Sequence, residues 1–183
     1  MIATNGNRPR IDLTDVDAFA EVAHAGQERA SGVPYIDHPR AVRAILENEY
    51  PESVDDETLA VALLHDVLED CDVHPSILLN RWGRLVQEGV TMLSWRIRAL
   101  EIERDQHMYW SGVRRGPRLV RLVKAADRID NLRGTIADGD PRRREKYLIE
   151  TREHLIPILE EAGEMWWVRE LEALLDTLEE TAR

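Results

Sequence analysis

Four ionisable residues close an otherwise apolar helical segment, and no other feature of this 183-residue sequence constrains the fold as strongly. The segment ETLAVALLHDVLED (57–70) has no glycine or proline and is apolar nearly all round, which predicts a helix from Asp56 to about Asp70 buried in a core. His65, Asp66, Glu69 and Asp70 stand at its end. Burying several charged groups is costly unless they are paired or bind a metal ion. Compensating partners must therefore come from other parts of the chain.

The remaining periodicity predicts an all-α protein, with residues 1–183 forming a single domain and no strands or repeats. Residues 1–11 are polar and aperiodic, and we expect them to be frayed. The other predicted helices are one near Thr14, with Thr14 and Asp17 as a capping box; His38-Pro39 to about Leu46; one from His74-Pro75, with Gly83 and Gly89 as breaks; Ser94 to about Trp110; one from Gly116-Pro117 to Gly134; and two after the basic turn 141–144.

Bulk properties argue against several classes of function. No apolar run approaches the roughly 20 residues that span a bilayer, and the N-terminus lacks the apolar core of a secretory signal, so we expect a cytoplasmic protein. The formal net charge of −11 disfavours binding to nucleic acid or acidic lipid, which both carry dense negative charge. A small anionic ligand is still compatible with this charge, because it responds to the local field of a pocket.

A divalent metal ion would explain the ionisable cluster, because it neutralises carboxylates and accepts the lone pair of an imidazole. On a helix His65 and Glu69 are four residues apart, as are Asp66 and Asp70, so each pair projects to one side. Cys71 is the only cysteine, which excludes a cysteine-rich zinc site. Any metal must therefore be bound by histidines and carboxylates.

Two further ligand candidates lie in other segments. His38 stands between a loop and a predicted helix start, and Asp127 lies inside the apolar run LVKAADRIDNL, one turn before Asn131. Ordinary explanations exist for each candidate: His65-Asp66 can be a structural pair, Asp127 can bind Arg128, and His38 can be an unremarkable residue before a proline. Three separate apolar contexts each hold a costly ligand type, and this joint occurrence favours a metal site.

Four stretches of the sequence match the motifs of a known superfamily. In chain order they are AHAGQERASGVPYIDHP (23–39), ETLAVALLHDVLED (57–70), RWGRLVQEGVT (81–91) and LVKAADRIDNLRG (122–134). The combination of QxR, PYIxHP, ALLHDVxED and KxADRxxNL is much more specific than any one of these motifs. The chain thus resembles the HD-domain superfamily, and within it the hydrolase domain of RelA/SpoT proteins and the small alarmone hydrolases.

The resemblance implies a helical bundle around one metal ion, commonly manganese, that removes the 3′-pyrophosphate from the alarmone (p)ppGpp. The metal ligands that it implies by position are His38, His65, Asp66 and Asp127. Glu69 and Asp70 match the family's catalytic acidic pair. Arg29 matches an arginine placed against the guanine base, and Asn131 matches an asparagine that contacts the nucleotide.

The sequence departs from the family pattern at Ala30 and Met92, where family members often have basic residues. Two phosphate contacts that the resemblance would imply are therefore absent. Four other arginines either replace these phosphate contacts or form a solvated basic face: Arg96, Arg98, Arg114 and Arg115.

The leading prediction is a manganese-dependent (p)ppGpp hydrolase. The alternatives are an HD-domain phosphohydrolase of another purine nucleotide and a nucleotide-sensing module with little turnover.

Overall fold

Helices account for most of the computed structural model, which describes residues 11–30 and 32–181. The expectation that residues 1–11 are frayed falls outside this range, except for Ile11. In chain order the elements are α1 (Leu13–Ala23), α2 (Asp37–Asn48), α3 (Asp56–Leu64), α4 (Val67–Asp70), α5 (Pro75–Trp82), α6 (Arg84–Leu93), β1 (Arg96–Ile97), the 3₁₀ turn η1 (Arg98–Leu100), β2 (Ile102–Glu103), α7 (Gln106–Arg115), α8 (Arg118–Asp138), α9 (Pro141–Glu150), the π-helical turn η2 (Thr151–Leu155), α10 (Ile156–Glu161) and α11 (Met165–Glu180). The predicted all-α class is confirmed.

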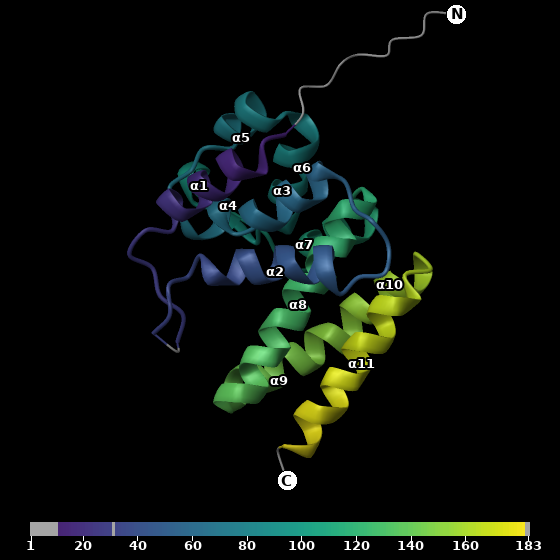
Figure 1. The fold of residues 1–183 in the computed structure, drawn as a ribbon. Helices are drawn as coiled ribbons and strands as arrows, with labels where there is room; N and C mark the ends of the chain where they lie inside the picture. Colours follow the sequence, from purple (N-terminus) through teal and green to yellow (C-terminus); the bar gives the residue numbers. More distant parts are fainter. Residues whose placement is uncertain (1–10, 31, 182–183) are drawn as a thin grey trace, which may run out of the picture.

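The long helix α8 runs from the middle of the molecule down to the turn before α9 (Figure 1). It packs against α2, α3, α6 and α7 and, among the C-terminal helices, against α9 and α11. Its apolar side chains Leu119, Leu122, Val123 and Ala126 are buried, as their helical spacing predicts. The buried apolar residues of the described chain form one cluster, so α8 lies within the core with both groups of helices around it.

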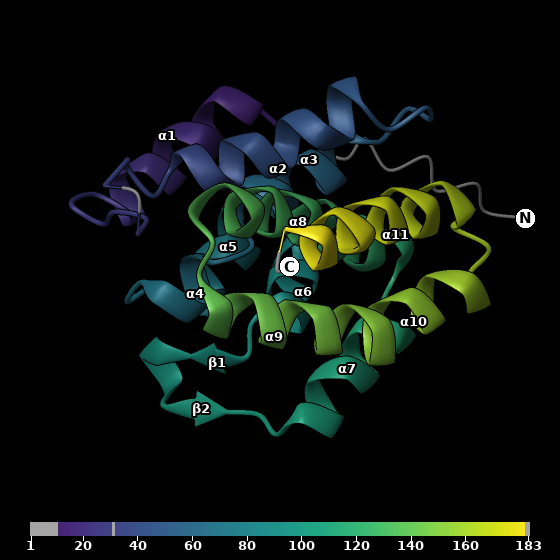
Figure 2. The same ribbon diagram turned by 90° about the horizontal axis from the view of Figure 1, so that it is seen from below.

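The C-terminal helices enclose one side of α8. Figure 2 shows α9, η2 and α10 nearly in line, with α11 beside them. Trp167, Leu171, Leu175 and Leu178 recur at helical spacing along α11 and are buried, so this side of the helix faces the core. None of the described helices combines the length and the apolar character that crossing a membrane requires.

Residues 94–110, predicted to be helical throughout, contain a short antiparallel hairpin, so the prediction of no strands is wrong. In it β1 and β2 pair Arg96 with Glu103 and Ile97 with Ile102. The cause is a distant contact: the Trp95 amide donates to Glu69 Oε2 at 2.7 Å, which places this backbone outside a helix. Local helical preference is weak, and contacts with the rest of the fold override it here.

Two predicted helix ends also differ from the structure. Helix α1 is capped by Asp12, whose side chain accepts from the Thr14 amide, so the predicted capping box of Thr14 and Asp17 is wrong. Helix α8 continues through Gly134 and ends at Asp138, where the following residue, Gly139, has a left-handed backbone conformation (φ 70°). Glycine favours that conformation because it has no Cβ.

Gly89 was predicted to break a helix, but it lies inside α6. A Cβ atom at this position would lie 2.7 Å from Leu119 Cδ1 and 2.9 Å from Val61 Cγ2. Gly89 therefore allows α6 to approach α3 and α8 closely, and its role is in packing.

Candidate functional site

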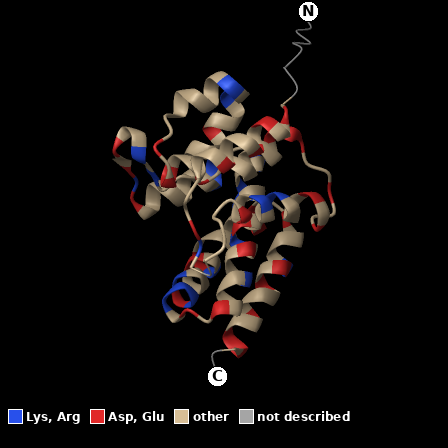
Figure 3. Cartoon of the chain, turned by 60° about the vertical axis from the view of Figure 1, so that its left-hand side comes forward, with Lys and Arg blue, Asp and Glu red and all other residues tan. Residues whose placement is uncertain are grey.

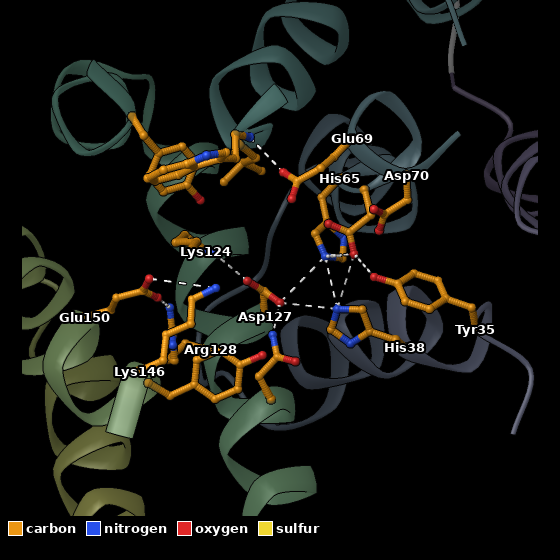
Figure 4. Close-up of a pocket in the computed structure, with 16 residues that line it drawn as sticks. Tyr35, His38, His65, Glu69, Asp70, Lys124, Asp127, Arg128, Lys146 and Glu150 are labelled. Atoms are coloured by element: carbon orange, nitrogen blue, oxygen red, sulfur yellow. Dashed lines mark hydrogen bonds and ion pairs between the residues drawn. The ribbon is translucent and has the colours of Figure 1, made fainter. Parts of the chain in front are cut away.

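A cavity of about 470 Å³ contains most of the predicted site residues (Figure 4). Its lining includes Tyr35, His38, His65, Asp66, Glu69, Asp70, Lys124, Asp127 and Asn131. These residues come from the loop before α2, from α2, from the connection between α3 and α4, from α4, and from α8. The site is therefore assembled from segments far apart in the sequence.

The helix predicted from Asp56 to Asp70 is broken where the ligand candidates lie. Helix α3 ends at Leu64 and α4 begins at Val67, so His65 and Asp66 form the connection. Adjacent residues on a continuous helix do not face the same point. The break lets them do so, because His65 Nε2 lies 3.1 Å from Asp66 Oδ2.

His38 and His65 are both buried and are both held through Nδ1. His38 Nδ1 lies 2.7 Å from Asp130 Oδ2, and His65 Nδ1 lies 2.8 Å from the Ala62 carbonyl oxygen. Each acceptor favours a proton on Nδ1, which leaves Nε2 free to bind a cation. The two Nε2 atoms face one another at 3.2 Å.

Asp127 comes to this point from α8. Its Oδ1 lies 3.2 Å from His38 Nε2 and 3.7 Å from His65 Nε2. Lys124 Nζ donates to Asp127 Oδ2 at 2.8 Å, and Asn131 Nδ2 donates to Oδ1 at 2.5 Å. The alternative in which Asp127 binds Arg128 is not seen.

Three of these side chains, His38, His65 and Asp127, offer ligand atoms close enough to hold a divalent metal ion, and Asp66 lies beside the two histidines. The ligand atoms of His38, His65 and Asp127 all lie within 4.8 Å of one another, and Asp66 Oδ2 lies 3.5 Å from His38 Nε2. Ligands about 2.1 Å from a divalent ion are themselves about 3.0 to 3.4 Å apart in octahedral or tetrahedral geometry. Two imidazoles with two carboxylates are a donor set that such ions accept.

The charges of the cluster shift its pKa values strongly. Burial opposes the charged form of His38, but hydrogen bonds with Asp127 and Asp130 outweigh it and raise the pKa of the imidazole. For His65, burial is outweighed by the charge of Asp66, and its pKa is raised well above the usual value. Burial likewise opposes the charged form of Asp127, but Lys124 and the histidines hold its pKa well below the usual value. The carboxyl groups of Asp66 and Asp127 therefore stay ionised and attract any available cation.

Glu69 and Asp70 lie beside the cluster on α4. Burial, followed by the charge of Asp66, raises the pKa of both carboxyl groups. Glu69 is oriented by the Trp95 amide, whereas Asp70 Oδ1 lies 3.5 Å from Arg96 Nη2. A carboxylate whose pKa is raised binds a proton more tightly than an ordinary carboxylate does, which suits a group that accepts and returns a proton.

Of the two predicted substrate contacts, Asn131 and Arg29, only Asn131 lies in the cavity lining. Asn131 lines the cavity and binds Asp127. Arg29 lies outside the lining residues, and its Nη1 binds Asp130 Oδ2 at 2.9 Å. With 23% of its side chain exposed, Arg29 is nevertheless reachable from solvent.

The predicted replacement arginines divide into two groups. Arg96 Nε donates to the Glu69 carbonyl oxygen, and Arg98 Nη1 donates to that of Asp70, so both lie beside the acidic pair. Arg114 instead binds Glu161 at 3.1 Å and, with Arg115, lines a separate cavity.

Sequence reasoning missed Tyr35, Lys124 and Asp130 as parts of the site. Tyr35 donates its hydroxyl proton to Asp66 Oδ2 at 2.7 Å. Tyr35 and Lys124 lie within the PYIxHP and KxADRxxNL motifs, which was the available signal. For Asp130 the only signal was its position three residues after Asp127 on the same helix.

The helical fold and the converging histidines and aspartates define a helical protein with a histidine–aspartate site suited to a divalent metal. The family model of the HD domain matches residues 17–154. The chain belongs to the HD-domain family, and the resemblance inferred from its motifs is confirmed.

Among curated relatives, a guanosine-3′,5′-bis(diphosphate) 3′-pyrophosphohydrolase from Vibrio cholerae is 39% identical over 163 residues, covering 85% of this chain and 22% of that protein. The bifunctional (p)ppGpp synthase/hydrolase SpoT from Escherichia coli K12 is 35% identical over 161 residues, with coverages of 85% and 22%. A probable GTP pyrophosphokinase from Mycobacterium leprae is 36% identical, with coverages of 85% and 20%. The chain thus spans about a fifth of the length of these relatives.

A solved structure has nearly the same extent as this chain. It is described as a metazoan ortholog of SpoT that hydrolyses ppGpp and plays a role in starvation responses. The two structures align with a TM-score of 0.71 and 25% sequence identity, over 93% of this chain and 94% of the other.

Proposed function

We propose that this chain is a manganese-dependent hydrolase that removes the 3′-pyrophosphate of (p)ppGpp. The observation that carries the proposal is the convergence of His38, His65, Asp66 and Asp127 beside two carboxyl groups of raised pKa in one cavity. The longer relatives include proteins named for synthesis as well as hydrolysis, so their names alone do not decide the reaction. The metazoan ortholog, matched over nearly its whole chain and described as hydrolysing ppGpp, supports hydrolysis.

The proposed metal ligands are His38, His65, Asp66 and Asp127. Once bound, a divalent ion would supply Lewis acidity, which lowers the pKa of water and polarises a phosphoryl oxygen. Tyr35 orients Asp66 through its hydrogen bond, and Lys124 compensates the buried charge of Asp127. These contacts keep the ligands in place while substrate enters and product leaves.

Glu69 and Asp70 are the proposed proton carriers. Either carboxylate would accept a proton from the attacking water as its oxygen bonds to phosphorus, and would return it to the oxygen of the departing group. The raised pKa values suit a group that must accept and release a proton in one turnover. The Trp95 amide fixes the orientation of Glu69, which favours Glu69 as the residue that meets the water.

Basic side chains on α8 and α9 would attract the phosphates. Lys124, Arg128 and Lys146 line the cavity, and 64% of the Lys146 side chain is exposed. Figure 3 shows basic residues gathered on one helix of an otherwise strongly acidic chain, and the sequence places such a run, PRRREK, at the start of α9. Asn131 and Arg29 remain the proposed contacts to the nucleoside.

A second substrate assignment has a specific basis, since Ala30 and Met92 remove two basic residues associated with the alarmone. Purified protein with Mn²⁺ should be incubated with guanosine tetraphosphate and a panel of other purine nucleotides, with EDTA-treated protein as the control. Release of pyrophosphate and GDP from guanosine tetraphosphate supports the proposal. Cleavage of another nucleotide alone would favour the second assignment, and tight binding without cleavage would favour a sensing module.

A further inference from the structure

A single carboxylate oxygen joins a proposed metal ligand to a proposed substrate contact. Asp130 Oδ2 lies 2.7 Å from His38 Nδ1 and 2.9 Å from Arg29 Nη1. Only 14% of the Asp130 side chain is exposed, so little water competes for this oxygen. His38 and Arg29 therefore share one acceptor.

The bond to Asp130 determines which nitrogen of His38 carries the proton. With the proton on Nδ1, the Nε2 lone pair points toward Asp127 and His65, where a cation would bind. In the other tautomer Nε2 would donate to Asp127 and could not bind a metal ion. His65 differs, because its Nδ1 is held by the backbone carbonyl of Ala62, which carries no net charge.

Arg29 competes with His38 for the same negative charge. While Arg29 lies against Asp130, its positive charge reduces the pull of the carboxylate on the Nδ1 proton. A carboxylate that attracts this proton makes the imidazole a stronger metal ligand. Drawing Arg29 away from Asp130 should therefore strengthen metal binding, and a bound metal should in turn favour release of Arg29.

We propose that Asp130 is a positioning residue that couples Arg29 to the proposed metal ligand His38. The inference rests on the proposed metal site and does not depend on which nucleotide is the substrate. It assigns to Asp130 an effect on metal affinity, together with a dependence of that affinity on Arg29.

The first experiment titrates the full chain with Mn²⁺ alone in a calorimeter. Asp130→Asn keeps the shape and removes the charge, whereas Asp130→Ala removes the acceptor as well. We expect losses in Mn²⁺ affinity of about 10- to 100-fold, larger for alanine. Asp37→Asn is the matched control, because it removes the same charge from an exposed residue adjacent to His38. Equal affinities in the wild type and in both Asp130 variants would overturn the inference.

The second experiment adds Arg29→Ala to the wild type and to Asp130→Asn. A coupling through Asp130 predicts that loss of Arg29 raises Mn²⁺ affinity severalfold in the wild type and much less in the Asp130→Asn background. Direct repulsion between Arg29 and the ion would act in both backgrounds alike. An identical effect in the two backgrounds would therefore reject the coupling.

A measurement on the wild type keeps the inference testable if the variants do not fold. Nitrogen NMR of the protein loaded with diamagnetic Zn²⁺ should show the His38 proton on Nδ1 and the metal on Nε2. A proton on Nε2 would exclude the proposed role of Asp130. Failure of the wild type to bind Mn²⁺ or Zn²⁺ at all would instead overturn the metal site itself, so the two failures are distinguishable.

Discussion

His38 Nε2 and His65 Nε2 lie 3.2 Å apart, although 27 positions separate the two residues in the sequence. Because each Nδ1 is held elsewhere, the two Nε2 lone pairs would repel one another if nothing lay between them. A proton or a metal ion relieves this repulsion. A proton and a divalent metal ion therefore compete for the space between these two Nε2 atoms.

The first prediction concerns this competition. The pKa values of His38 and His65 are raised in the metal-free fold, so protonation stabilises that fold. This stabilisation is complete below the unfolded pKa of about 6.5 and is lost as the pH rises through the raised folded values. Mn²⁺ binding requires loss of these protons and should strengthen over the same pH range.

The competition between protons and Mn²⁺ is tested by measuring thermal unfolding with EDTA and with Mn²⁺, each at about pH 6 and about pH 9. The increase in Tm caused by Mn²⁺ should be larger at the higher pH. An increase that is equal at both values, or larger at the lower one, would contradict the proton competition.

The second prediction concerns Asp127→Asn. The substitution should abolish Mn²⁺ binding and leave the buried ammonium group of Lys124 without its carboxylate. Breaking a buried ion pair in this way typically reduces the free energy of unfolding by about 3 to 5 kcal/mol. Urea unfolding and metal analysis measure the two effects. The double variant Lys124→Met with Asp127→Asn should recover part of the stability but none of the metal binding, and a full metal content in Asp127→Asn would remove Asp127 from the ligand set.

The third prediction concerns Glu69→Gln. A glutamine oxygen can still accept from the Trp95 amide, so the local structure and the metal content should be retained. Loss of the proton carrier should reduce kcat by about 10²- to 10⁴-fold. Asp72→Asn, an exposed neighbour, is the control and should leave kcat unchanged. A Glu69→Gln variant with wild-type kcat would assign the proton to another group.

Local sequence patterns were sufficient for much of the fold and for the neighbourhood of the site. The apolar run before His65 predicts a buried helix, and the spacing of Leu119, Leu122 and Val123 predicts α8, because each signal lies within one element. Costly ionisable residues in apolar segments supplied the candidate ligands, the family motifs implied which four of them form the set, and the structure brings these side chains together.

The features that were not predicted depend on residues far apart in the chain. Tyr35 is 31 positions from Asp66, and His38 is 92 positions from Asp130. The hairpin after α6 depends on the contact between Trp95 and Glu69 across 26 positions. The local pattern of apolar residues carries no information on contacts between distant residues. Helix propensity alone therefore assigned residues 94–110 to a helix.

The fourth prediction concerns packing at Gly89. In Gly89→Ala the new methyl group would press on Leu119 and Val61, and we expect the free energy of unfolding to fall by about 1 to 3 kcal/mol. Gly112→Ala in α7 is the matched control, since its nearest neighbour would be the Met92 carbonyl oxygen at 3.9 Å. In Gly112→Ala, the helical preference of alanine should raise the free energy of unfolding by about 0.5 to 1 kcal/mol. Urea unfolding of both variants checks the opposite signs, and a stabilised Gly89→Ala would refute the close approach.

The proposed metal ligands come from α2, from the connection between α3 and α4, and from α8. An ion held by all three would act as a reversible cross-link present only in the folded chain. Its stabilisation would grow with the logarithm of free ion concentration, reaching about 2.7 kcal/mol at one hundred times the dissociation constant. The susceptibility of this protein to proteases, and with it its lifetime, would then follow the metal supply of the cell.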